Sequence, residues 1–393
     1  MRPLQGVTVL SLEHAIAAPF CTRQLAELGA RVIKVERPGV GDFARAYDTR
    51  VNGLSSHFVW VNRSKESLTL DVKRPEAQTI LQRLIEESVD VVVQNLAPGA
   101  AARLGLSYEA LSARKPSLIV CDISGYGSDG PYRDRKAYDL MIQSEAGFLS
   151  VTGTEREVVK AGVSVADIAA GMYAFSCILA ALLERNRTGL GRRLDVSMLE
   201  SLVEWMGFPL YYAYDGAPPP PRAGASHSSI YPYGPFPAGD GKTVIFGLQN
   251  EREWVIFCER VLDRPELARD ERFSSNARRD AARAELYQII VDTFATTDAE
   301  ELRRRLDQAG IANARVNELD EVWHHAQLRE RRRWREVGSP VGPIAVPLPP
   351  GCGVDEDVPM SAIPALGEHT DAILLGLGYD AESIARLRAA GTI

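Results

Sequence analysis

Apolar and polar positions alternate between two patterns in the first half of the chain. Short runs rich in Val and Ile, apolar on both faces, occur at 7–12, 31–37, 89–96 and 118–124. Between them the apolar positions recur at helical spacing, at 19–28, 75–87 and 108–113. Strands that are buried on both faces and alternate with helices are typical of a parallel sheet covered by helices. The pattern therefore predicts a large, doubly wound α/β domain.

An unusually apolar stretch, DIAAGMYAFSCILAALL at 167–183, continues this pattern and leads through a basic turn to a strand at 193–198. Its first residue is Asp167, a carboxylate at the start of a segment that has to be buried. One interpretation is a helix N-cap, which an Asp side chain makes readily. The other is a carboxylate nucleophile that backbone N–H groups keep ionised while it is poorly solvated. The two roles are compatible, since each oxygen can take one of them.

The second half of the chain begins with a break at 215–225, DGAPPPPRAGA, whose four prolines favour an extended spacer. A hairpin with a turn at 239–241 and helices at 251–262, 281–295 and 298–309 follow. A second segment rich in Pro and Gly, at 338–353, precedes two terminal helices. We therefore predict a large domain at 1–215, a linker at 216–225, a small α+β domain at 226–325, a return linker at 326–355, and terminal helices at 356–393 that complete the large domain.

Composition narrows the class of protein. The 393 residues include 45 basic and 52 acidic side chains, a net charge of −7, which gives no general attraction to nucleic acid or to an anionic membrane. The five cysteines are scattered without a C-x-x-C pair, so neither a disulfide framework nor a zinc site is indicated. No signal peptide is evident, and the apolar stretch is shorter than the ~20 residues of a membrane span. We expect a cytoplasmic protein that binds no metal.

Several common kinds of site are disfavoured. The first β–α connection, at 13–19, contains no G-x-G-x-x-G, which argues against a nicotinamide dehydrogenase even though Glu36 ends the second strand. The chain also contains no G-x-x-x-x-G-K-[ST] and no G-x-S-x-G. Nucleotide hydrolysis and serine-esterase chemistry are therefore weak hypotheses.

A set of ordered motifs remains. They are ELGARVIKVERPGVGDFAR (27–45), DVKRPEA (71–77), QNLAPGAAARLGL (94–106), ISGYGSDGPYRDRKAYDLMIQSEAG (123–147), Asp167, RTGLGRRLDVSMLES (187–201) and PALGEHTDAIL (364–374). Over essentially its whole length the chain resembles the family III (CaiB/BaiF-type) coenzyme A transferases, which include formyl-CoA transferase. The resemblance implies a homodimer whose two chains thread through one another like linked rings.

The resemblance also implies a mechanism. Asp167 matches the catalytic aspartate of the family, which attacks an acyl-CoA thioester and passes through an acyl anhydride to an aspartyl–CoA thioester. An acceptor carboxylic acid then reverses these steps and leaves as the new thioester. No tightly bound cofactor is required, because coenzyme A enters as a substrate.

By the same match, the phosphates of CoA are expected on Arg37, Lys73, Arg103 and Lys136, with Tyr138 and Asp139 near the thioester. Each of these cations follows a strand or lies in a loop, where solvated basic residues are also common. His14 and Ile16, after the first strand, are expected to line the substrate cleft, although a lone loop histidine more often has a structural role.

Two departures from family patterns affect the substrate. Related racemases carry a histidine where this chain has Tyr138, and a phenol of pKa about 10 is a poor base at neutral pH. A 2-methylacyl-CoA racemase therefore stays as an alternative, as does an inactive CoA-binding protein. The glycine-rich loop of formyl-CoA transferase is replaced by FGLQNEREW (246–254). Together with GIANARVN (310–317), this segment resembles the subset that acts on dicarboxylates such as mesaconate, itaconate, citramalate or succinate.

Overall fold

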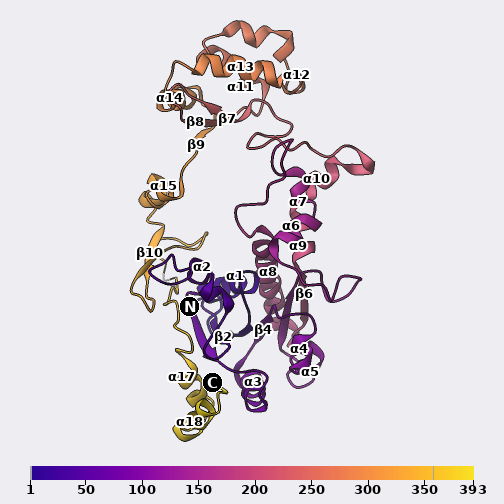
Figure 1. The fold of residues 1–393 in the computed structure, drawn as a ribbon, viewed down its shortest axis with the longest axis vertical. Coiled ribbons are helices and arrows are strands. Elements are labelled where there is room, and N and C mark those ends of the chain that lie inside the picture. Colours follow the sequence, from indigo (N-terminus) through magenta and orange to yellow (C-terminus); the bar gives the residue numbers. More distant parts are fainter. Residues whose placement is uncertain (1, 357) are drawn as a thin grey trace. The chain divides into compact units, whose positions relative to one another are not determined.

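The computed structural model describes residues 2–356 and 358–393, which fold as two units (Figure 1). The large unit comprises Met1–Gly147, Ala161–Gly207 and Ala326–Ile393. The small unit comprises Phe148–Lys160 and Phe208–His325. The large unit is thus built from three separate stretches of the chain, and it contains every residue for which we predicted a catalytic or CoA-binding role.

The large unit contains a six-stranded sheet in which all neighbouring strands are parallel. Its order is β3 (Lys65–Thr69), β2 (Arg31–Glu36), β1 (Thr8–Leu12), β4 (Val91–Gln94), β5 (Ile119–Ser124) and β6 (Arg193–Ser197). The strand order changes direction between β1 and β4. In sheets of this kind the crevice beyond the carboxyl ends of two such strands is the usual ligand site.

Helices cover both faces of this sheet (Figure 1). On one face α1 (Ala17–Glu27) packs against α8 (Val165–Thr188), and both contact the strands. On the other face, α3 (Pro75–Ser88), α5 (Tyr108–Ser112), α17 (Thr370–Gly376) and α18 (Ala381–Ala389) share a core with Leu10 and Ile33. Because alternate strand residues point to opposite faces, Lys34 and Ser11 face α1 while Leu10 and Ile33 face α3. The expected mixed α/β fold with a large parallel sheet is confirmed.

Shorter elements surround this frame. They are η1 (Phe43–Ala46), α2 (Ser56–Asn62), α4 (Ala100–Arg103), α6 (Asp139–Glu145), α9 (Met198–Trp205) and α16 (Ala326–Glu330). An antiparallel pair, β10 (Trp334–Val337) and β11 (Ile344–Pro347), packs its apolar residues against Phe58 of α2. Residues 326–355 therefore contain a hairpin as well as connecting segments.

The small unit has its own antiparallel sheet and aromatic core. Its strands are β7 (Tyr233–Pro237), β8 (Thr243–Gly247) and β9 (Asn313–Arg315), where the sequence predicts a hairpin for the first two. Phe236, Phe246 and Trp254 pack with residues of α11 (Glu251–Arg260), α13 (Arg283–Phe294) and α14 (Ala299–Ala309). The remaining helices are α7 (Phe148–Val151), α10 (Gly207–Tyr212), α12 (Asn276–Ala281) and α15 (Leu319–Trp323), with short turns η2 (Tyr214–Gly216), η3 (Pro265–Arg269) and η4 (Glu271–Phe273).

Helix α8 differs from the sequence expectation at both ends. It starts at Val165, two residues before Asp167, and continues through 24 residues into the segment that we predicted to be a turn. A helix of this length that contains an 18-residue window with a mean hydropathy of 1.8 could span a membrane, so the shortness of the apolar run does not support our expectation that there is no span. Buried core helices share these properties, and α8 packs against α1, α9, β5 and β6.

Candidate active site at the carboxyl edge of the large sheet

Asp167 lies in the first turn of α8, and another residue caps that helix. The Asp139 side chain, at the start of α6, accepts hydrogen bonds through Oδ1 from the backbone N–H groups of Ala166 (2.8 Å) and Asp167 (3.4 Å). Its Oδ2 accepts a bond of 2.5 Å from the buried amide of Gln143. The interpretation of Asp167 as the N-cap is therefore wrong, because Asp139 already occupies these N–H groups.

The backbone N–H of Ala17, the first residue of α1, instead faces the Asp167 carboxylate closely enough to favour its ionised form and lower its pKa. Gly171, one turn further along α8, makes this approach possible. A Cβ atom at position 171 would lie 2.7 Å from the carbonyl oxygen of Ala17 and 3.0 Å from the Phe20 ring. The absence of a side chain at Gly171 thus allows the start of α1 to lie against the first turn of α8.

The surroundings of Asp167 disfavour its charge. Burial and the nearby Asp139 carboxylate raise the pKa of Asp167 to about 7, and the Ala17 N–H opposes this shift. The sequence led us to expect a side chain held ionised by N–H groups. The structure instead shows a carboxylate that is only partly ionised at neutral pH and, once ionised, weakly solvated. Strong perturbation by burial and by a like charge is characteristic of reactive carboxylates.

The first β–α connection lies beside this carboxylate. The backbone N–H and C=O of His14 form reciprocal hydrogen bonds of 2.9 Å with the side chain of Asn95, which follows β4. These bonds join the loops that leave β1 and β4, where the strand order changes direction. The His14 ring is partly exposed and stacks on Phe43 at 5.1 Å, whereas Ile16 is 3% exposed and packs inside the unit.

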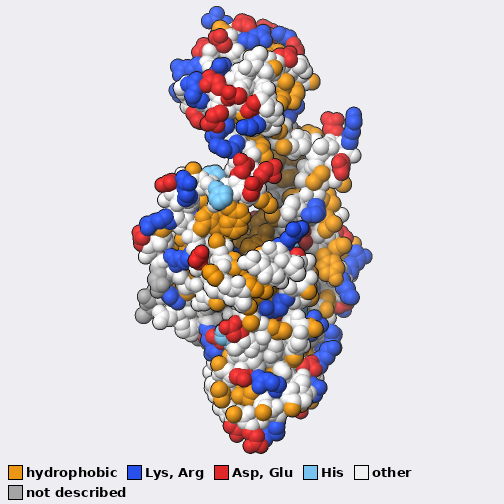
Figure 2. All heavy atoms as spheres, turned by 60° about the vertical axis from the view of Figure 1, so that its left-hand side comes forward, with side chains coloured by type: hydrophobic (Ala, Val, Ile, Leu, Met, Phe, Trp, Pro, Cys, Tyr) orange, Lys and Arg blue, Asp and Glu red, His pale blue; other side chains and the backbone are white. Residues whose placement is uncertain are grey.

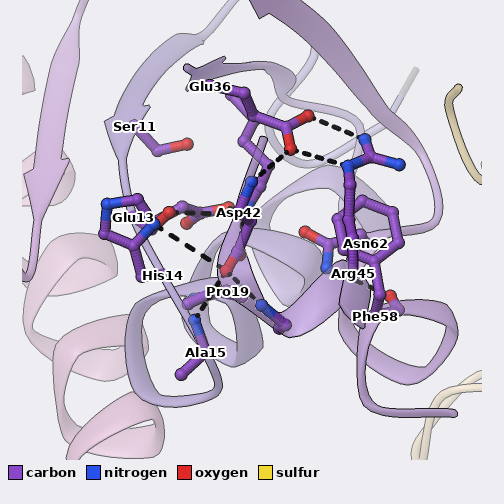
Figure 3. Close-up of polar contacts among 12 residues, drawn as sticks. Ser11, Glu13, His14, Ala15, Pro19, Glu36, Asp42, Arg45, Phe58 and Asn62 are labelled. Carbon is purple, nitrogen blue, oxygen red and sulfur yellow. Dashed lines mark hydrogen bonds and ion pairs between the residues drawn. The ribbon is translucent and has the colours of Figure 1, made fainter. Parts of the chain in front are cut away.

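A cluster of buried charges lies next to this connection (Figure 3). Glu13, Lys34, Asp42 and Lys65 have completely buried side chains and form three ion pairs, in which Glu13 and Lys34 each take part twice. Sequence reasoning missed this cluster, although Asp42 belongs to the GDFAR segment that carried part of the family resemblance. It also missed Tyr47, a partly exposed residue whose pKa is raised by burial and by the carboxylates of Asp42 and Asp167.

The four expected CoA-binding cations are all exposed. Each follows the carboxyl end of a different strand: Arg37 follows β2, Lys73 follows β3, Arg103 ends α4 after β4, and Lys136 lies between β5 and α6. Within residues 2–356 and 358–393, none of the four forms an ion pair with a carboxylate. They are therefore available for an anionic ligand.

Other charges on the protein surface are mixed. On the face drawn in Figure 2, basic and acidic side chains are interspersed. Tyr138, beside Lys136, is 69% exposed and forms the N-cap position of α6. In the part of the chain that the structure describes, no group of three or more His, Cys, Asp or Glu side chains could hold a metal ion.

Comparison with known proteins places this fold among the CaiB/BaiF structures. A crystal structure of a CaiB/BaiF family protein from Brucella suis superimposes with a TM-score of 0.84 at 32% identity, covering 96% of this chain and 99% of that one. The sequence profile of CoA-transferase family III matches residues 4–370. The chain belongs to CoA-transferase family III, and it is an enzyme of that class.

Curated relatives span nearly the whole chain. The succinyl-CoA:glutarate CoA-transferase of Mus musculus is 36% identical, covering 100% of this chain and 91% of its own length. The succinyl-CoA–D-citramalate CoA-transferase of Chloroflexus aurantiacus is 32% identical, covering 99% and 97%. Both relatives are transferases, which supports transfer over the racemase and the inactive binding protein that the sequence left open.

Proposed function

We propose that the enzyme moves CoA between acyl groups through a thioester on Asp167. The Asp167 carboxylate attacks the thioester carbon of the donor and expels CoA thiolate, which leaves a mixed acyl–aspartyl anhydride. The thiolate then attacks the aspartyl carbonyl, releases the donor acid and forms aspartyl–CoA. The acceptor carboxylate repeats these two steps in reverse, so that CoA leaves on the acceptor and Asp167 is regenerated.

The observation that carries this proposal is the environment of Asp167. Its carboxylate is poorly solvated, lies against a second carboxylate and contacts one backbone donor, the Ala17 N–H. When the aspartyl carbon is attacked, negative charge develops on its oxygen, and a fixed N–H at this position stabilises that charge. All four steps exchange a carboxylate and a thiolate, so no oxidant, metal or tightly bound cofactor is required.

Binding of CoA is assigned to the four unpaired cations and to the side chains next to them. Phosphates need cations that are not already neutralised by carboxylates. Arg37, Lys73, Arg103 and Lys136 meet that condition and lie at the edge of the sheet where Asp167 and the His14 loop are found. Tyr138 and Asp139 then lie near the thioester, because Asp139 contacts the first turn of the Asp167 helix.

The substrates we propose are succinyl-CoA as donor and a small C4 or C5 dicarboxylate as acceptor. Glutarate and citramalate appear in the names of the two curated relatives above, and both are dicarboxylates. Mesaconate, itaconate and succinate belong to the same chemical class. A screen of these acids with succinyl-CoA, with succinate supplied in isotopically labelled form, read by mass spectrometry of the CoA thioesters, identifies the acceptor.

We further propose a cytoplasmic homodimer of interlinked chains. Apolar side chains are exposed on two helices of the large unit: Leu140 (44%) and Met141 (47%) on α6, and Met172 (38%) and Leu183 (62%) on α8. Exposed apolar side chains of this kind are suited to a large, apolar interface. Sedimentation at micromolar protein should give a single dimeric species, and a monomer that grows on dilution would contradict the linked arrangement.

An oxygen-18 experiment tests the covalent route. If an acceptor acid labelled in both carboxylates attacks aspartyl–CoA, one labelled oxygen remains on Asp167 when the new thioester leaves. The next donor acid to be released carries that oxygen away. We expect one labelled oxygen in the released succinate per turnover, and label on the Asp167 peptide. Unlabelled succinate, or label on another carboxylate, would exclude Asp167 as the nucleophile.

A further inference from the structure

The buried charges next to the first β–α connection restrain its backbone. Lys65, on β3, donates hydrogen bonds from Nζ to Glu13 Oε1 (2.6 Å), to the Pro19 carbonyl (3.0 Å) and to Asn62 Oδ1 (3.1 Å). Glu13 is the first residue of the connection, and Pro19 lies in the first turn of α1. A single ammonium group therefore ties together both ends of the segment 13–19.

A second lysine restrains the middle of the same segment. Lys34, on β2, donates to Asp42 Oδ2 at 2.8 Å and lies 3.4 Å from both Glu13 Oε1 and the Glu13 carbonyl. Asp42 Oδ1 in turn accepts from the backbone N–H groups of Ala44 (2.9 Å) and Ala15 (3.3 Å). Two lysines thus face two carboxylates, while the His14 ring lies 3.7 Å from Asp42 Oδ1 and Glu36, which pairs with Arg45, also acts on Lys34.

The backbone that this cluster restrains is strained. Ala15 has a φ of +60°, a left-handed conformation that is unfavourable for alanine. Such a conformation persists only where surrounding contacts impose it, and strained residues of this kind are concentrated at functional sites. Two residues later the chain presents the Ala17 N–H to Asp167, so the direction of that donor depends on the conformation of Ala15.

Burying two charged lysines costs folding free energy, which indicates that they serve a role other than stability. Burial opposes the charge of both, yet Glu13 and Asp42 raise the pKa of Lys34, whereas burial dominates at Lys65 and lowers its pKa. Apolar residues at all four positions of the cluster would fill the same space without desolvating any charge. The charges hold the backbone of the segment 13–19 in one conformation, which apolar residues would not do.

We propose that Lys65 and Asp42 are positioning residues that hold the Ala17 N–H against Asp167. The proposal rests on the assignment of Asp167 as nucleophile. The groups that face Asp167 are the Asp139 carboxylate from α6, the Tyr47 phenol from the segment after η1, and the Ala17 N–H from α1. Of these, only the N–H favours the ionised nucleophile. If the Ala17 N–H moves away, Asp167 becomes harder to ionise, and the developing oxyanion loses its hydrogen-bond donor.

The test is the substitution Lys65→Met, with Arg63→Met as a matched control. Arg63 is a second buried basic residue, two positions before Lys65, but it pairs with Glu27 at the far end of α1. Both substitutions remove one buried cation from the same stretch of chain and should lower Tm. Only Lys65→Met should move the pH dependence of transfer, with its acid limb displaced upward by about one pH unit.

The kinetic constants give a second readout. For Lys65→Met we expect kcat at pH 6 to fall at least about ten-fold with little change in KM for the CoA ester, because the lost contact acts on the chemical step. Should Lys65→Met not fold, Asp42→Asn, which has the same shape, is assayed in the same way and should show a smaller shift of the same sign. A folded variant of either kind with the pH profile of the wild type would overturn the proposal.

Trapping separates this inference from the proposed function. Incubation with succinyl-CoA followed by hydroxylamine should modify Asp167 in the wild type and, more slowly at pH 6, in Lys65→Met. Modification of a different carboxylate would show that the nucleophile was misassigned. Modification of Asp167 at equal rates in both proteins would leave the nucleophile standing and refute the positioning role alone.

Discussion

The replacement Asp167→Asn should make the protein more stable while abolishing transfer. Asn has the same shape, and its carbonyl oxygen can still accept the Ala17 N–H. It removes a charge that lies in a desolvated site beside Asp139. The variant thus relieves an electrostatic penalty that the wild type carries only when Asp167 is ionised.

The size of the effect follows from the pKa. In the folded protein, the pKa of Asp167 is raised from 3.8 to about 7, a shift of about 3 units. At about 1.4 kcal/mol per unit this amounts to about 4 kcal/mol. Since the side chain is partly open to water, about half of that, near 2 kcal/mol, is a realistic expectation.

The sign of the pH dependence follows from linkage. Because the folded pKa lies above the unfolded one, ionisation of Asp167 costs nothing below about pH 4 and its full amount above about pH 7. Urea unfolding at a fixed protein concentration should show Asp167→Asn ahead of the wild type by about 2 kcal/mol at pH 8.5 and by roughly half as much at pH 5. The exposed Asp134, replaced by Asn, is the control and should show no such trend.

Two results would refute this reasoning. The first is a variant that is less stable than the wild type at pH 8.5, because Asp167 would then be stabilised as an anion. The second is a difference that does not change with pH. In either case burial and the Asp139 carboxylate would not raise the pKa of Asp167 as the structure indicates.

Four further outcomes are expected. Transfer by the wild type should rise through an acid limb near pH 7, because Asp167 must ionise before it attacks, and a flat profile from pH 5.5 to 8 would contradict that pKa. Gly171→Ala should lower kcat about ten-fold or more without raising KM, because the added methyl group pushes Ala17 away from Asp167. A crystal structure of the variant in which α1 has not moved would contradict this explanation. In heavy water a chiral 2-methylacyl-CoA should take up no deuterium, whereas rapid uptake would favour racemisation. Single alanine substitutions of the proposed phosphate-binding residues should raise KM for CoA esters more than they lower kcat. These residues are Arg37, Lys73, Arg103 and Lys136, and an unchanged KM in all four variants would contradict their assignment.

The frame of the large unit could be predicted because most of its strands are apolar on both faces. Four of the six strands, β1, β2, β4 and β5, are rich in Val, Ile and Leu, and this composition indicates a buried strand even without knowledge of its neighbours. Strand β3 was missed because it reads Lys-Glu-Ser-Leu-Thr and has the composition of an exposed segment. Its lysine is buried, and only the fold brings Glu13 within reach of it.

The candidate site was predictable to the extent that it depends on single residues. Asp167 could be recognised from its place at the head of an apolar helix and from the family resemblance. Its relation to Asp139 could not, because two positions 28 residues apart meet only when α6 and α8 pack together. Nor does any local pattern indicate that residues 148–160 join the small unit.

The close approach of Asp139 and Asp167 also bears on the energies of the states in the catalytic cycle. The resting enzyme has the Asp139 and Asp167 carboxylates near one another, but in the anhydride and thioester that we propose, the Asp167 side chain itself carries no charge. Both repulsion and desolvation of the nucleophile disappear when the acyl or CoA group is attached. In the proposed mechanism this relief favours aspartyl–CoA over the free enzyme, so without an acceptor acid the protein should accumulate as its own CoA thioester.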